Sequence, residues 1–133
     1  MTTAQEALQI SGIMPNLTVD DLQKSVSFYE ALGFIVDERW EENGMLQGVM
    51  LRAGKHYIGL SQDDWKKGRD RKKGIGMRVF ISTTQNIDEI AKRAKSAGIK
   101  LDAEPHDTEW KSRAFHVTDP SGFLLTISSE AAA

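Results

Sequence analysis

The sequence predicts an α+β fold built from two tandem β-α-β-β-β modules. Two helix-like segments, at residues 22–33 and 87–98, each end at a glycine and lead directly into a strand-like run. Each segment follows one strand-like run and precedes three others. The two segments begin 65 residues apart, which is too long for a solenoid repeat, so we expect two units that share one core.

The first module begins with a short strand. Leu17 and Val19 alternate with the polar residues Asn16 and Thr18, as they do in a strand with one buried face. Pro15 cannot donate a hydrogen bond to a neighbouring strand, so it favours a strand start or a sheet edge.

A helix and three strands complete this module. Asp20 and Asp21 can cap the start of the helix, and Gly33 is typical of a helix end. Turn signals around Gly44 and Gly54 separate the three strand-like runs that follow. These runs cover residues 34–40, 45–52 and 56–61.

The pattern restarts after a charged connector at residues 63–74, which is typical of a solvated loop. The second module has its helix at residues 87–98, and its strands are expected at residues 77–82, 99–103, 113–118 and 123–128. A length of 133 residues is common for one domain, so residues 1–133 are expected to form a single domain. Its modules cover about 12–62 and about 75–129.

The composition is that of an ordinary globular protein, with 40% hydrophobic and 27% charged residues. A formal net charge of −2 gives no general attraction to nucleic acid or to an anionic membrane. The absence of cysteine excludes disulfides and thiolate metal sites. No apolar run is long enough to span a membrane and the first residues do not resemble a signal peptide, so we expect a cytoplasmic protein.

Two segments carry longer motifs. Residues 17–34 read LTVDDLQKSVSFYEALGF, in which V-x-D-L is followed by S-x-x-F-Y-x-x-L-G-F. Residues 110–122 read WKSRAFHVTDPSG, which contains W-x-x-R-x-F-x-x-x-D-P-x-G. Both segments resemble the vicinal-oxygen-chelate superfamily of glyoxalases, bleomycin-resistance proteins and dioxygenases, and the resemblance covers residues 12–129.

The resemblance implies two curved mixed sheets around a cavity, and it implies a homodimer. It leaves the activity open, because this fold hosts isomerases, dioxygenases, thiol transferases and metal-free drug-binding proteins. The metal-dependent members place a His or Glu ligand at each of four positions. The matching positions here are Met14, Gly59, Gly76 or Met77, and Thr126.

None of those positions holds a carboxylate or an imidazole, and a thioether is a poor ligand for the divalent ions that this family uses. We therefore expect no metal site and no cofactor. The three histidines do not share a metal-binding spacing either; they are His56, His106 and His116. The nearest branch of the superfamily is then the metal-free, bleomycin-resistance-like one.

The candidate ligand-binding residues are polar or aromatic. Alternation turns Met14, Asn16 and Thr18 away from the helix, and it does the same for Thr126 in the last strand. Aromatic side chains suit a planar or amphipathic ligand, and the candidates are Trp40, Tyr57, Trp65, Trp110 and Phe115. Phe28 and Phe80 are expected to fill the core instead.

These observations favour a metal-independent protein, similar to the bleomycin-resistance branch, that sequesters a small aromatic or cationic compound in a cavity and confers antibiotic resistance. An enzyme remains the alternative: a lyase, isomerase or dioxygenase that uses a displaced metal site, or metal-free proton transfer by His56, His116 or Glu42. A third class, a partner-binding module without a small ligand, predicts a shallow or filled cavity.

Overall fold

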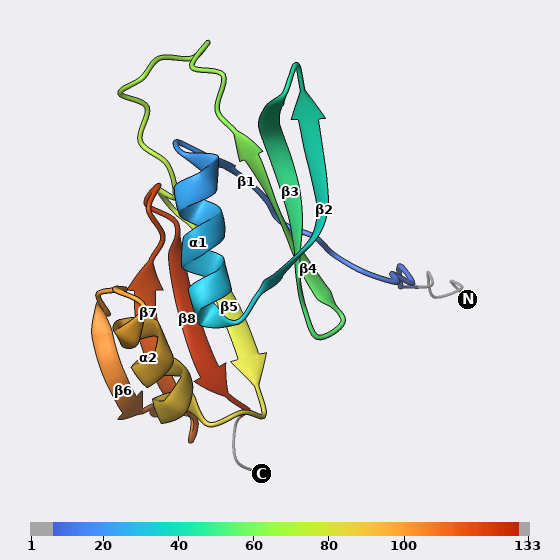
Figure 1. Ribbon diagram of the computed structural model, residues 1–133. Coiled ribbons are helices and arrows are strands. Elements are labelled where there is room, and N and C mark those ends of the chain that lie inside the picture. The colour runs from blue at the N-terminus through green and yellow to red at the C-terminus, as the bar shows by residue number, and fades with distance from the viewer. Residues whose placement is uncertain (1–6, 131–133) are drawn as a thin grey trace, which may run out of the picture.

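The computed structural model describes residues 7–130 and confirms the predicted α+β fold, with the β-α-β-β-β order repeated in two modules (Figure 1). Each module forms one four-stranded mixed sheet. The expectation that the chain lacks a signal peptide falls partly on residues 1–6, which lie outside the described residues.

Sheet one belongs to the first module and has the strand order β1-β4-β3-β2. Strands β1 and β4 are parallel, and the other pairs are antiparallel. The caps of α1 are the predicted ones: Asp21 accepts a hydrogen bond from the backbone N–H of Lys24, and Gly33 ends the helix at φ 113°. The elements are β1 (Asn16–Val19), α1 (Leu22–Leu32), β2 (Ile35–Glu42), β3 (Met45–Ala53) and β4 (His56–Gln62).

Sheet two repeats this topology in the order β5-β8-β7-β6, with β5 parallel to β8. Asn86 caps α2 by accepting a hydrogen bond from the backbone N–H of Glu89 at 3.0 Å. The elements are β5 (Arg78–Thr83), α2 (Ile87–Ser96), β6 (Ala103–Asp107), β7 (Arg113–Thr118) and β8 (Leu124–Ser129).

The strand predicted at residues 99–103 is wrong in position, because β6 begins only at Ala103. The residues just before β6 still belong to the end of α2, because the backbone N–H of Ile99 donates to the carbonyl of Ala94 at 3.0 Å. Gly98 has a φ of 93°, which turns the chain away from α2.

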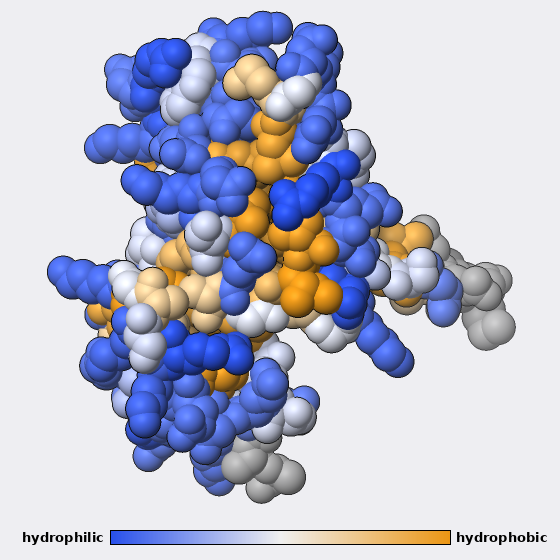
Figure 2. All heavy atoms as spheres, viewed as in Figure 1, coloured by the Kyte–Doolittle hydropathy of each residue, from blue (hydrophilic) through white to orange (hydrophobic). Residues whose placement is uncertain are grey.

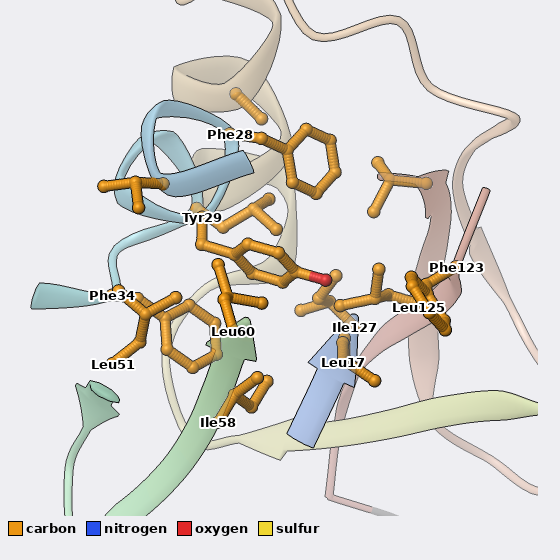
Figure 3. Close-up of a cluster of buried hydrophobic side chains, with 14 of the residues drawn as sticks. Leu17, Phe28, Tyr29, Phe34, Leu51, Ile58, Leu60, Phe123, Leu125 and Ile127 are labelled. Carbon is orange, nitrogen blue, oxygen red and sulfur yellow. The ribbon is translucent and has the colours of Figure 1, made fainter. Parts of the chain in front are cut away.

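The hydrophobic core joins both modules around Tyr29, a fully buried side chain of α1 (Figures 1 and 3). Its ring packs edge-on against Phe28 and Phe34, with centroid distances of 5.2 and 5.6 Å. Figure 3 shows the ring between Leu60 of sheet one and Leu125 of sheet two. One core therefore fixes the position of the two sheets relative to each other.

The Tyr29 hydroxyl connects the two family-like motifs. It donates a hydrogen bond to Oδ2 of Asp119 at 2.9 Å, and the other oxygen of that carboxylate accepts from the backbone N–H groups of Ser121 and Phe123. Burial, followed by the Asp119 charge, raises the pKa of Tyr29 far above its ordinary value. The phenol is therefore neutral and acts as a donor.

Phe80 is not a core residue, contrary to the prediction, because 68% of its side chain is exposed. Its strand alternates: Val79 and Ile81 pack against the core, whereas Arg78 and Phe80 point the other way. Phe28 is buried as predicted.

The connector between the modules is more than a solvated loop. The side chains of Asp63 and Lys73 are only 5% and 4% exposed, and they form an ion pair at 2.9 Å. Lys73 also pairs with Asp20, and Arg71 pairs with Asp63 at 3.1 Å. This ionic cluster ties the connector to the end of β1.

Hydrophilic residues cover most of the face seen in Figure 2, and an apolar strip crosses it between α1 and the β2–β3 hairpin. Partly buried residues at the margin of the core, including Val36 and Leu46, belong to these strands. Within residues 7–130, neither helix has the length and the apolar character that a membrane span requires.

Candidate functional site

The candidate site is built from the open face of each sheet, meaning the face turned away from the buried core. In sheet one, backbone pairing sets Asn16, Gly59, Met50 and Glu38 in one row across the four strands. Paired residues in neighbouring strands project from the same face, so this row lies on the open face. The opposite face carries the core residues Leu17, Val19, Val49, Leu51, Ile58 and Leu60.

A second row on the open face contains Thr18, Ser61, Gly48 and Trp40. The Trp40 ring covers Gly48, since a Cβ atom at that glycine would lie 3.2 Å from Cε3 of the ring. Half of the Trp40 side chain, 48%, stays exposed. The structure therefore places Asn16 and Thr18 on this face, as the alternation predicted, together with the aromatic candidate Trp40.

Met14 and Asn16 meet above Gly59. The Asn16 amide donates to the Ser61 hydroxyl at 3.1 Å, and a Cβ atom at Gly59 would lie 2.6 Å from its Oδ1 and 3.4 Å from the Met14 methyl group. A side chain at position 59 would force the Asn16 amide to move. Tyr57, two residues earlier in β4, extends the same face and is half-buried.

The open face of sheet two carries a polar network centred on Thr126. Nη1 of Arg78 donates to Oγ1 of Thr126 at 3.0 Å, and Oγ1 lies 2.8 Å from Nδ1 of His116. Nη1 of Arg78 also lies 3.5 Å from Nδ1, and because a guanidinium can only donate, Nδ1 acts as an acceptor in this cluster. The neutral His116 ring therefore carries its proton on Nε2.

The His116 ring is held in its neutral form. Burial lowers the pKa of His116, the guanidinium of Arg78 and the neighbouring His106 lower it further, and Asp102 opposes the shift. The ring of His106 lies beside it, with the centroids 5.5 Å apart. Arg78 supplies a permanent positive charge to this cluster.

The other aromatic candidates lie apart from this face. Phe115 is fully buried in the core, which corrects the expectation that it contacts a ligand, because alternation in β7 places it with Val117. Trp110 lies in the turn between β6 and β7 and is 58% exposed. Trp65 lies in the connector, about 5 Å from the cationic groups of Arg69 and Lys73.

Sequence reasoning missed Arg78 and assigned its place to Gly76 or Met77. Those two residues precede β5, whereas Arg78 is in the strand and bonds to Thr126. The signal was present in the sequence: Arg78, Phe80 and Ser82 alternate with Val79 and Ile81.

The residues at the family's metal positions do not fit a divalent cation. Gly59 offers no side chain, Met14 offers a thioether, and the Thr126 hydroxyl is engaged by Arg78 and His116. The guanidinium of Arg78 would repel a cation at this corner. Among residues 7–130, no three His, Asp or Glu side chains are placed to share a metal ion.

Two open hollows lie on the helix side of the molecule. One, of about 460 Å³, lies between α2 and β6 and includes Lys92 and Glu104. The other, of about 440 Å³, lies between the two helices and includes Lys24 and Phe28. Neither is lined by the predicted ligand-binding residues.

The chain belongs to the Glyoxalase/Bleomycin resistance protein/Dioxygenase superfamily, whose family model matches residues 9–127. The match includes both motifs and all eight strands except the last residues of β8. No curated protein matches the sequence.

Several solved structures share the fold. TioX from Micromonospora sp. ML1 is similar at 20% identity and a TM-score of 0.73, over 90% of this chain and 98% of that one. A glyoxalase/bleomycin resistance protein/dioxygenase from Nocardioides is similar at 18% identity and a TM-score of 0.69, over 93% and 85%. A glyoxalase-related enzyme from Fulvimarina pelagi has 16% identity and a TM-score of 0.70, over 92% and 89%.

Proposed function

We propose that this chain is a metal-independent protein that binds a small aromatic or cationic molecule on the open faces of its sheets. The observation that carries the proposal is the set of side chains at the family's metal positions. A thioether, a glycine and a hydroxyl bonded to an arginine replace the usual ligands. Binding, rather than metal-assisted chemistry, is what these groups support.

The open face of sheet one has the chemistry for such a ligand. Trp40 and Tyr57 offer ring surface, and Met50 between them can adapt to a flat molecule. Glu38 shares a row with Met50 and would attract a cationic substituent. We propose that Met14, Asn16, Thr18 and Thr126 complete the contacts, with Trp65 and Trp110 at the rim.

We also propose that the functional form is a homodimer. Trp40 and Phe80 are 48% and 68% exposed on the open faces, and Met77 beside β5 is 42% exposed. Exposed apolar groups of this size mark contact surfaces. A second copy that faces these sheets would enclose the ligand.

The enzymatic alternative has one point of departure, the neighbouring rings of His106 and His116. A displaced metal site would need a third ligand there, and the carboxylate nearest in the network, Asp102, is already bonded by the Thr118 hydroxyl at 2.5 Å. We therefore favour sequestration.

A thermal-shift screen tests the proposal, since a ligand of the native state raises the melting temperature. At about one hundred times its Kd, a ligand adds about 2.7 kcal/mol, which corresponds to a shift of several degrees. The panel contains planar antibiotics, glycopeptide antibiotics, catechols, α-keto acids, glutathione adducts and divalent metals.

We expect an organic compound, and none of the metals, to stabilise the protein. Trp40→Ala should abolish that shift. The control is Leu8→Ala, which removes an 86% exposed side chain outside the sheets and should leave the shift unchanged. Elemental analysis that finds one tightly bound divalent ion per chain would contradict the proposal.

A further inference from the structure

We infer that Arg78, His116 and Thr126 form a binding site for a carboxylate group on the open face of sheet two. The inference rests on the proposed function and refines it: among aromatic ligands, this site selects those that carry a carboxylate. It follows from the donors that the network leaves free.

The free donors of Arg78 form a fork. Nη1 is engaged by Thr126, whereas Nε and Nη2 make no hydrogen bond within residues 7–130. Arg78 also has no acidic partner in that part of the chain. The Nε–Nη2 edge presents two parallel N–H groups, whose spacing matches the two oxygens of a carboxylate.

Thr126 gives this fork a fixed position. Its side chain is 1% exposed, and its hydroxyl accepts from Nη1 at 3.0 Å while it bonds to His116. A guanidinium held in this way loses less conformational entropy when it binds an anion than a free surface arginine does. Thr126 therefore acts as a positioning residue.

His116 supplies a further donor beside the guanidinium. With Nδ1 accepting from Thr126, the ring proton lies on Nε2 and remains available to a ligand oxygen. The charged or titratable groups that face His116 are Arg78 from β5, His106 from β6, and Asp102 just before β6. One permanent positive charge with neutral donors suits a monoanion better than a phosphate dianion.

Titrations with matched naphthalene probes test the inference. 2-Naphthoate, 2-naphthamide and 2-naphthyl phosphate share the ring system and the point of attachment, and they differ in the polar group. We expect wild-type protein to bind naphthoate about 10- to 100-fold more tightly than naphthamide, the range expected for a charge-assisted pair. Arg78→Gln should remove this preference, and Arg78→Lys, which lacks the fork, should retain only part of it.

The matched control is Arg39→Gln. It makes the same charge change at an exposed arginine whose strand partner, Val49, faces the core, so the naphthoate preference should persist. Equal binding of naphthoate and naphthamide by wild type, or a preference that survives Arg78→Gln, would overturn the carboxylate site. Stronger binding of the phosphate probe would overturn it as well.

Failure of the inference differs from failure of the proposed function. If naphthamide binds and naphthoate gains nothing, the carboxylate site falls while aromatic binding stands. If no naphthalene probe binds and the wider screen also yields no ligand, both fall.

Discussion

At the scale of single residues, two close contacts decide what the chain tolerates. Gly59 lies beneath the Asn16 amide, with no space for a side chain between them. Tyr29 places its hydroxyl on Asp119 from inside the core. The contact between Gly59 and Asn16 lies on the open face of sheet one, and the bond between Tyr29 and Asp119 lies in the core.

Gly59→Ala should destabilise the protein by about 0.5–1.5 kcal/mol, because the new methyl group would displace the exposed Asn16 amide and break its bond to Ser61. Urea unfolding measures the change in free energy. Gly12→Ala is the control, since a Cβ atom at Gly12 meets nothing within 4 Å. Equal midpoints for the two variants would contradict this account of Gly59.

Tyr29→Phe should cost about 1–3 kcal/mol, since it leaves one oxygen of the buried Asp119 carboxylate without its donor. The loss should also depend on pH. The pKa of Tyr29 is raised from 10.0 in the folded state, so the unfolded chain releases this proton first as pH rises above that value.

The stabilisation from Tyr29 should therefore be complete below about pH 10 and should decline above it. Urea unfolding of wild type and Tyr29→Phe at pH 8 and at pH 11 measures the difference. If the difference in unfolding free energy between wild type and Tyr29→Phe is the same at both pH values, the pKa of Tyr29 is not raised in the folded state.

At the scale of elements, capping and alternation predicted most of the fold. Asp21 and Gly33 cap the first helix as predicted, and β7 has the predicted bounds. Prediction failed where local signals compete. Residues 99–102 alternate like a strand. However, the backbone N–H of Ile99 bonds to the carbonyl of Ala94 at the end of α2, so the strand begins later.

The candidate site shows the same limit. Asn16 and Thr18 were predictable because their strand alternates clearly, whereas Trp40 was a candidate for its aromatic side chain. The bond of Arg78 to Thr126 depends on how two strands 48 residues apart align, and no local pattern gives that register. The ionic cluster of the connector was missed because its charges resemble those of a solvated loop.

Lys73→Met should lower the melting temperature by about 3–5 °C, because it removes the closest cation of Asp63 and leaves Arg71 as the remaining partner. Lys72→Met, one residue earlier and exposed, should have little effect. Differential scanning calorimetry compares the two. If both variants have the melting temperature of wild type, the ionic cluster does not stabilise the connector.

Asp63 and Lys73 also give this effect a pH dependence. The hydrogen bond with Lys73 holds the pKa of Asp63 below its ordinary value, so its contribution is present above that value and is lost as pH falls below it. The difference in melting temperature between Lys73→Met and wild type should therefore shrink in acid. A difference that grows in acid would contradict this assignment.

At the scale of the whole molecule, apolar side chains on the open faces predict self-association. We expect analytical ultracentrifugation to give about twice the chain mass of 14.8 kDa. Phe80→Glu should shift the protein toward monomer by placing a charge in the interface. Gln23→Glu, on the exposed side of α1, should not. A monomer at every concentration would refute the homodimer.

The hydroxyl–carboxylate bond between Tyr29 and Asp119 spans 90 positions of the chain. Each module therefore completes its core only when the other module packs against it. A fragment that ends at the connector would expose Phe28, Tyr29 and Phe34 to water. Folding should therefore proceed as a single all-or-none transition, and the duplicated halves should be unable to survive as independent proteins.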